Sequence, residues 1–205
     1  MAFSDKKYKE LSEVLDMFSI KHTKNNFLII NVTTQVPAAL RDDLAFILDN
    51  WDYQMSEEGV CEAVIFPILK EGWKNFADVF SFWSHKYIYW NDELKGAPDY
   101  MIAQKSSLGA SVFKSPYIAV IEAKADNFSK AWGQCLTEMH TIQLLNGNPE
   151  LPVFGIISNG ETWKFGKLTQ NEFIENRDFY NISDLDKLFS ALITFLEDCK
   201  QVYIK

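Results

Sequence analysis

Hydrophobic and polar positions alternate along the chain with two periods, one typical of helices and one typical of strands. Apolar residues three and four positions apart predict amphipathic helices, whereas short runs of β-branched and aromatic residues predict strands. The helical pattern covers residues 5–19, 37–51, 125–146 and 183–203. The strand pattern covers residues 27–34, 84–90, 116–122 and 151–158. Helices that alternate with strands predict an α/β fold.

Polar residues and glycines mark the ends of several elements. Asp126 or Asn127 suits the first position of the third predicted helix, and Asn146-Gly147 suits its end. The strands on either side of this helix should be parallel neighbours, because a strand–helix–strand passage is right-handed in nearly all folds. Asn159-Gly160 predicts a tight hairpin after the second of these strands.

A further helix is predicted from Ser56, which can cap its first turn, and Pro67 should kink or restart it. Glu57 begins a helical stripe that is otherwise apolar, which makes it a candidate site residue. Glu58 and Glu62 are the alternatives on a neighbouring face. All three are equally compatible with surface acids that the helix dipole favours.

Composition limits the class of protein. The chain has 205 residues and 47% apolar residues, enough for one domain or for one domain with an appendage. No apolar run approaches the ~20 residues that a membrane helix needs. The N-terminus lacks the apolar segment of a secretion signal, and the three widely separated cysteines fit reduced thiols better than disulfides. We therefore expect a cytoplasmic protein without a membrane partner.

The net charge of −8 argues against tight, autonomous binding of nucleic acid. Proteins that bind nucleic acid are usually basic, because neutralising phosphates supplies much of the affinity. Two alternatives stay open: a local basic groove on this chain, or a partner that supplies the contacts to nucleic acid.

The clearest candidate chemistry lies at the end of the strand at residues 116–122. Glu122 and Lys124 point to the same face, because side chains alternate along a strand. Asp99 precedes that strand and reaches Glu122 if the two segments pair as antiparallel strands. Two carboxylates beside one ammonium suit a hard cation such as Mg²⁺. An ion pair between Lys124 and one of the carboxylates, without catalysis, is the alternative.

This pattern resembles the PD-(D/E)XK nuclease superfamily. The motifs that carry the resemblance are Pro98-Asp99 and Glu122-Ala123-Lys124. They stand between the acidic helix at residues 56–73 and a helix that contains Gln134, and an SNG hairpin follows. The chain is similar to the nuclease domain of type I restriction motor subunits and their stand-alone relatives over roughly residues 55–168.

The resemblance implies a fold and a set of roles. The fold is α/β, a restriction-endonuclease-like three-layer core with a central mixed β-sheet flanked by helices. Residues 55–205 form the nuclease-like domain, and residues 1–54 form an N-terminal accessory helix–strand–helix segment. Asp99 and Glu122 are the implied ligands of Mg²⁺ or Mn²⁺. The implied catalytic residues are Glu57, Asp99, Glu122, Lys124 and Gln134.

The function that the resemblance implies is metal-dependent endonuclease activity on nucleic acid, DNA first, in restriction or defence. A homodimer or a protein partner is compatible with it. The alternative from another class is a nuclease-like module without catalysis, which binds a protein or a nucleic-acid end. Of these two alternatives, only the enzyme needs a divalent cation for its activity.

Overall fold

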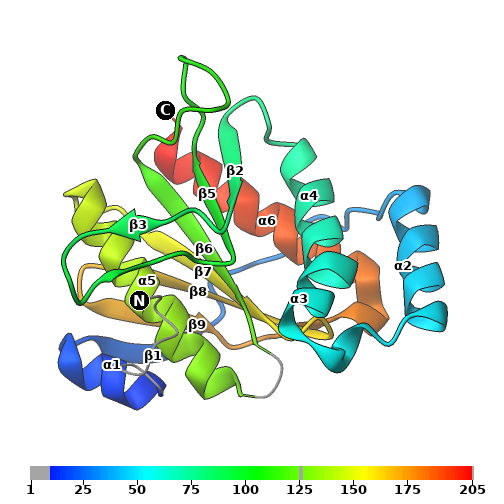
Figure 1. Ribbon diagram of the computed structural model, residues 1–205, viewed down its shortest axis with the longest axis horizontal. Helices are drawn as coiled ribbons and strands as arrows, with labels where there is room; N and C mark the ends of the chain where they lie inside the picture. Colours follow the sequence, from blue (N-terminus) through cyan, green and yellow to red (C-terminus); the bar gives the residue numbers. More distant parts are fainter. Residues whose placement is uncertain (1–9, 125–126, 205) are drawn as a thin grey trace.

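A mixed β-sheet of eight strands runs through the centre of the fold (Figure 1). The computed structural model describes residues 10–124 and 127–204. The strands follow the order β1-β9-β8-β7-β6-β5-β2, and β10 pairs with β8 beside this path. Their bounds are β1 Lys21–Asn25, β2 Phe80–Ser84, β5 Tyr100–Gln104, β6 Tyr117–Ala123, β7 Val153–Ser158, β8 Thr162–Thr169, β9 Glu172–Asn176 and β10 Tyr180–Asn181. A separate two-stranded ribbon consists of β3 Ile88–Tyr89 and β4 Lys95–Gly96.

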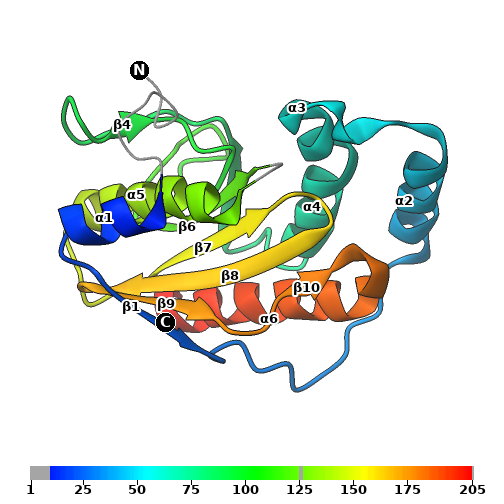
Figure 2. The same ribbon diagram turned by 90° about the horizontal axis from the view of Figure 1, so that it is seen from below.

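Helices cover both faces of the sheet, which confirms the α/β class with a central mixed sheet. They are α1 Leu11–Met17, α2 Ala38–Asn50, α3 Glu57–Val60, α4 Phe66–Lys74, α5 Phe128–Asn146 and α6 Leu185–Tyr203. Figure 2 shows α1 and α5 on one side of β7 and β8, with α6 on the other side. Two apolar clusters fill the two interfaces, one beneath α5 and one beneath α4 and α6. No helix in the described ranges is long and apolar enough to cross a membrane.

The order of pairing places the candidate residues. β2, β5 and β6 are antiparallel neighbours, so the start of β5 lies beside the end of β6. Helix α5 then carries the chain back to β7, which is parallel to β6 as predicted. β8 returns antiparallel to β7, and β9 follows antiparallel to β8.

Local signals in the sequence set most of the element ends. Ser56 Oγ accepts a hydrogen bond from the Gly59 N–H and so caps α3. Asn127 Oδ1 accepts from the first turn of α5, whereas Asp126 lies outside the described residues. Gly147 ends α5 in the left-handed conformation, with φ at 65°. The hairpin after β7 turns at Gly160, as predicted.

The predicted strand at residues 27–34 is wrong. The strand that joins the sheet is β1, and the following segment crosses the end of β9 without ladder pairing. The N–H groups of Phe27 and Leu28 donate instead to the side-chain oxygen of Asn176. β1 lacks an apolar pattern because it is an edge strand with mostly half-buried or exposed side chains, and such strands do not need one.

The prediction that residues 84–90 form the first strand of the sheet is also wrong. That strand is β2, which ends at Ser84. His85 has φ at 48°, a left-handed conformation that turns the chain out of the sheet. Ile88 and Tyr89 then pair with β4 in the separate ribbon. The strand predicted at residues 84–90 therefore begins four residues later than β2, which starts at Phe80.

Helix α5 packs closely on the sheet because two glycines face each other beneath it. Gly155 on β7 and Gly166 on β8 are paired in register. A Cβ at Gly166 would come within 2.7 Å of the Phe173 ring and 2.9 Å of the Trp132 ring. Both rings are buried, so neither can move aside without disturbing the core.

We therefore expect Gly166→Ala to lower the free energy of unfolding by about 1–3 kcal/mol, the usual cost of overpacking. Urea denaturation monitored by circular dichroism measures this change. An unchanged or higher midpoint would contradict it, and would mean that the gain in strand propensity exceeds the strain.

Candidate active site

Asp99 and Glu122 lie side by side at the junction of β5 and β6. The Asp99 N–H donates to Glu122 Oε1 at 3.2 Å, and the Ala123 N–H donates to Asp99 Oδ2 at 2.8 Å. Each carboxylate therefore accepts a bond from the backbone at or beside the other. The antiparallel register, with Tyr100 opposite Ile121, produces this reciprocal arrangement. The pairing predicted from the sequence thus brings the two acids together.

Gln134, on the helix that packs over Glu122, donates a further hydrogen bond to this carboxylate. Its Nε2 donates to Glu122 Oε2 at 2.6 Å, from the second turn of α5. Glu122 is only 1% exposed, and both of its carboxylate oxygens accept hydrogen bonds. These bonds fix the orientation of the carboxylate on the face of the sheet that α5 covers.

Glu138 is a site residue that sequence reasoning missed. It lies one helical turn after Gln134, is fully buried, and neither of its oxygens has a donor among the described residues. Burial, before all other causes, raises the pKa of Glu138 to about 8 and that of Glu122 well above its usual value. The signal in the sequence was only a glutamate four positions after Gln134, on the same face of the helix.

The two buried glutamates share a proton. Their negative charges oppose one another in a low-dielectric environment, so one of them stays protonated at neutral pH. The pair therefore carries a single negative charge.

Lys124 and Glu57 meet at the open end of the site. The Lys124 N–H donates to the Ser158 carbonyl at 2.9 Å, which extends the β6–β7 pairing past the end of β6. Its ammonium lies 3.2 Å from Glu57 Oε2, at the capped start of α3. The structure therefore brings Glu57 to Lys124, and the alternatives Glu58 and Glu62 line the adjoining pocket. Lys124 does not need Asp99 or Glu122 as its ion-pair partner.

His85 is a second neighbour of Asp99 that the sequence did not indicate. Its Nε2 lies 3.7 Å from Asp99 Oδ1, and its Nδ1 lies 2.8 Å from the Ser84 hydroxyl. The pKa of Asp99 is raised, mainly by burial and further by the charge of Glu57. The Ala123 N–H, His85 and Lys124 oppose that shift. Asp99 is thus an acid whose charge the protein alone compensates only in part.

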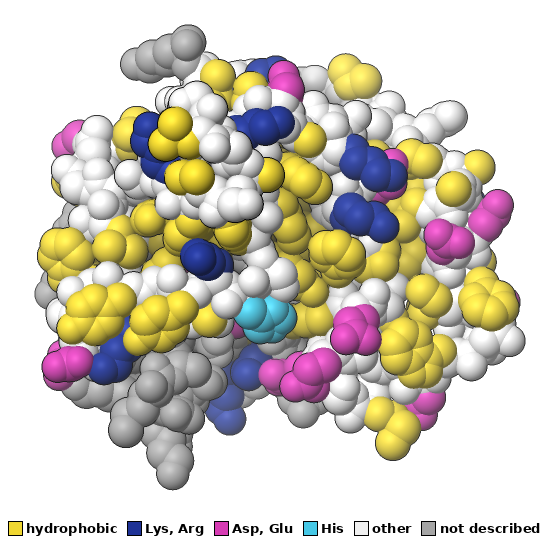
Figure 3. Space-filling view, turned by 45° about the horizontal axis from the view of Figure 1, so that its top comes forward, with side chains coloured by type: hydrophobic (Ala, Val, Ile, Leu, Met, Phe, Trp, Pro, Cys, Tyr) yellow, Lys and Arg dark blue, Asp and Glu magenta, His cyan; other side chains and the backbone are white. Residues whose placement is uncertain are grey.

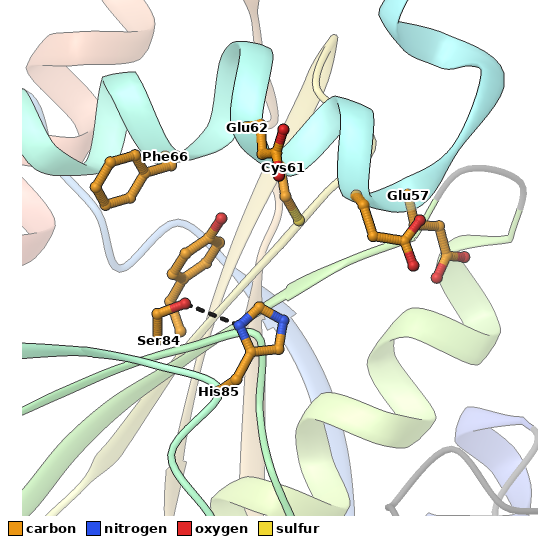
Figure 4. Close-up of a pocket in the computed structure, with 8 residues that line it drawn as sticks. Glu57, Cys61, Glu62, Phe66, Ser84 and His85 are labelled. Atoms are coloured by element: carbon orange, nitrogen blue, oxygen red, sulfur yellow. Dashed lines mark hydrogen bonds between the residues drawn. The ribbon is translucent and has the colours of Figure 1, made fainter.

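A pocket of about 430 Å³ opens beside these residues. Figure 4 shows Glu57, Cys61 and Glu62 on the helical side and Ser84 and His85 on the strand side. The helical wall contains a π-helical turn, Cys61–Ile65, before α4 restarts at Phe66. The restart fits the position of Pro67, which has no N–H to donate to the preceding turn.

The pocket does not carry a reactive cysteine. Burial raises the pKa of the Cys61 thiol to about 12, and the charges of Asp99, Glu57 and Glu58 add to the shift. A thiol with so high a pKa is protonated at neutral pH and is a poor nucleophile.

Figure 3 shows Asp and Glu side chains gathered beside a histidine on this face, between exposed hydrophobic side chains. The lining of the pocket includes three glutamates and the rings of Phe66 and Tyr100.

The donor set suits a hard cation. Among the residues that the structure describes, no three His, Cys, Asp or Glu side chains are grouped to hold a metal ion together. Mg²⁺, however, is commonly bound through one or two carboxylates, with water and substrate oxygens completing the octahedron. Asp99 and Glu122 fit that mode because both offer carboxylate oxygens and lie side by side, Glu122 accepting from the Asp99 N–H and Asp99 from the Ala123 N–H.

The arrangement unites three carboxylates, an ammonium and an orienting amide from four separate elements. Lys124 and Glu122 come from the end of β6, Asp99 from the start of β5, Gln134 from α5 and Glu57 from α3. No protein-family model matches the chain, and no curated protein matches it significantly in sequence.

Proposed function

We propose that the chain is a metal-dependent nuclease of the PD-(D/E)XK superfamily, with the restriction-endonuclease-like fold of that group. It hydrolyses phosphodiester bonds of nucleic acid with Mg²⁺ or Mn²⁺. The observation that carries the proposal is the convergence of Asp99, Glu122 and Gln134 through direct hydrogen bonds. The path from β2 through β5, β6 and α5 to β7 supports the same fold.

Each residue has a distinct role in this proposal. Asp99 and Glu122 would hold the metal ion, which supplies neutralisation of the phosphate and a more acidic bound water. Lys124 would stabilise charge that develops on the phosphate oxygens, as preorganised cations do. Glu57 holds the Lys124 ammonium in place at 3.2 Å. Gln134 keeps the carboxylate of Glu122 in a single orientation.

The proton shared by Glu122 and Glu138 limits the negative charge beneath the site. With it, the buried pair presents one charge to the metal side, and the protonated carboxyl can donate to the other. Without that proton, two buried carboxylates would face each other. Glu138 is therefore a positioning residue in this proposal, since it acts through Glu122.

The substrate and the cellular setting are part of the proposal. DNA is the first candidate, and the net charge of −8 favours a second copy of the chain or another protein as a source of positive charge. The three cysteines are buried free thiols, which fits a reducing, cytoplasmic environment.

The test is cleavage of labelled single-stranded and double-stranded DNA and RNA by the purified chain. We expect products with Mg²⁺ or Mn²⁺, none with EDTA, and none from Glu122→Gln at equal concentration. The substitution preserves side-chain volume, and circular dichroism checks that the variant is folded. Cleavage that persists in EDTA, or in the variant, would contradict the assignment, as would a complete lack of products from the wild type.

One observation favours the alternative, a nuclease-like module without catalysis. Both oxygens of Glu122 and one oxygen of Asp99 already have protein donors. The site is therefore held together without a cation, as a purely structural network would be. Such a module would bind nucleic acid or a protein equally well with and without EDTA and would release no products.

A further inference from the structure

The chain leaves the sheet at the candidate site and returns to it there. Residues 86–98, called here the aromatic ribbon, lie between His85 at the end of β2 and Asp99 at the start of β5. The His85 N–H donates to the Asp99 carbonyl at 3.0 Å and closes the base of the ribbon. The base of the ribbon therefore lies beside Asp99.

Two buried side chains and a set of hydrogen bonds fix the shape of the ribbon. Ile88 and Leu94 are buried, and Ile88 belongs to the apolar cluster beneath α5. At the turn, the N–H groups of Glu93 and Leu94 donate to Asn91 Oδ1, and the Trp90 N–H donates to the Leu94 carbonyl. The ribbon is thus anchored to the core and presents a preformed outer surface.

That outer surface is aromatic. Tyr87 and Tyr89 are each 53% exposed, and Trp90 is 46% exposed. Three exposed rings within four positions are more than a hairpin of this size needs to fold, because Ile88 and Leu94 already anchor it. Tyr and Trp rings present large flat faces at low conformational cost, which makes them effective in binding sites.

The charges around the rings are nearly balanced. Lys86 lies over the rings of Trp83 and Phe113, and Lys95 lies over the ring of Tyr89. Asp92, with Lys95 at 2.8 Å, and Glu93 contribute the negative charges. With two lysines and two acids, the ribbon lacks the strong positive field that would attract the phosphates of a duplex. Its contribution to binding must come mainly from ring faces.

We propose that the aromatic ribbon is a stacking platform for unpaired bases and that it presents a single-stranded segment of nucleic acid to the site at Asp99. Bases in a duplex are already stacked on one another, so exposed rings select strands whose bases are free. Because the inference names the substrate class of the site, it rests on the proposed nuclease function. The two lysines contribute contacts to the strand backbone.

Binding of fluorescein-labelled oligonucleotides in EDTA tests the platform apart from cleavage. We expect the wild type to bind a single-stranded oligonucleotide more tightly than the duplex of the same sequence. Trp90→Ala and Tyr89→Ala should each weaken single-strand binding by about 5- to 150-fold, the range for one stacked base. Trp90→Phe should retain most of the affinity because it keeps a ring face.

Trp51→Ala is the matched control. Trp51 is 47% exposed, closely similar to Trp90, but it follows α2 and is not part of the ribbon. This variant should bind as the wild type does. Both tryptophan variants should keep the wild-type melting temperature, which separates lost contacts from lost folding.

Several outcomes would overturn the inference. They are an absence of wild-type binding, a preference for duplex, equal losses in the Trp51 and Trp90 variants, or an effect of Trp90→Ala on oligomeric state alone. The last would identify the ribbon as a contact between copies, and sedimentation velocity detects it. Cleavage without any effect of the ribbon variants refutes only the platform. Ring-dependent binding without cleavage refutes only the nuclease.

Discussion

Lys124→Met is expected to reduce metal-dependent cleavage by about 10²- to 10³-fold, the loss seen when one preorganised charge-stabilising group is removed. The substitution takes away the ammonium and keeps most of the aliphatic stem. It leaves the hydrogen bonds among Asp99, Glu122 and Gln134 in place. Single-turnover cleavage with excess enzyme and saturating Mn²⁺ measures the loss in the chemical step.

Metal binding should survive this change and so separate a catalytic role from a structural one. Mg²⁺ at about 100 times its dissociation constant should stabilise both wild type and Lys124→Met by about 2.7 kcal/mol. Glu122→Gln should show little of this effect. Lys130→Met, an exposed lysine in the first turn of α5, is the matched control and should cleave normally. Equal activity of the two lysine variants would rule out the role of Lys124.

Glu138→Gln is expected to stabilise the metal-free protein at alkaline pH and to have little effect near pH 5. Glutamine has nearly the same shape as the protonated glutamate and can donate the same hydrogen bond to Glu122. Unlike glutamate, it never becomes a second buried charge. Because Glu138 touches the proposed metal ligand, the comparison is made in EDTA, where only the protein's own charges act.

The direction follows from proton counts. The pKa of Glu138 is raised to about 8 in the folded protein by burial, against its ordinary value of 4.5. Between these values the folded state holds a proton that the unfolded state has released. Stability of the wild type therefore falls as pH rises through this window, by at most about 1.4 kcal/mol per pH unit from this group. The advantage of the variant should grow over the same range and level off above about pH 8.

Thermal unfolding at pH 5, 7 and 9 measures this difference. Glu62→Gln removes one exposed negative charge close to the same pocket and controls for net charge. Its melting temperature should differ from that of the wild type by a small and constant amount. A pH-independent difference for Glu138→Gln would show that the two buried glutamates do not share a proton.

The residues that meet in the site were predictable where the signal is local. Side-chain alternation places Glu122 and Lys124 on one face, and a short antiparallel return brings Asp99 to them. Gln134 was implied by the resemblance alone, and in the structure it donates to Glu122 at 2.6 Å. The prediction for Asp99, Glu122 and Lys124 needed only the period of strands and the direction of the chain.

Other features depend on contacts that no local pattern contains. β1 is polar because it occupies an edge, so its sequence carries no strand signal. The segment after it is rich in β-branched residues but is held by Asn176, about 150 positions away. Glu138 reads as an ordinary polar residue of a helix until Glu122 is placed beneath it. In each case tertiary structure overrides the local preference.

The pairing of β1 with β9 has a consequence for the order in which the chain folds. Lys21 lies opposite Glu172, so this strand pair joins segments about 150 residues apart. During synthesis, β1 leaves the ribosome long before its partner exists. The hairpins and helix from β5 to β8 involve far shorter separations and can form first. Strand β1 therefore stays unpaired until β9 has been synthesised. During that time, its lysines disfavour pairing of the exposed strand with other molecules.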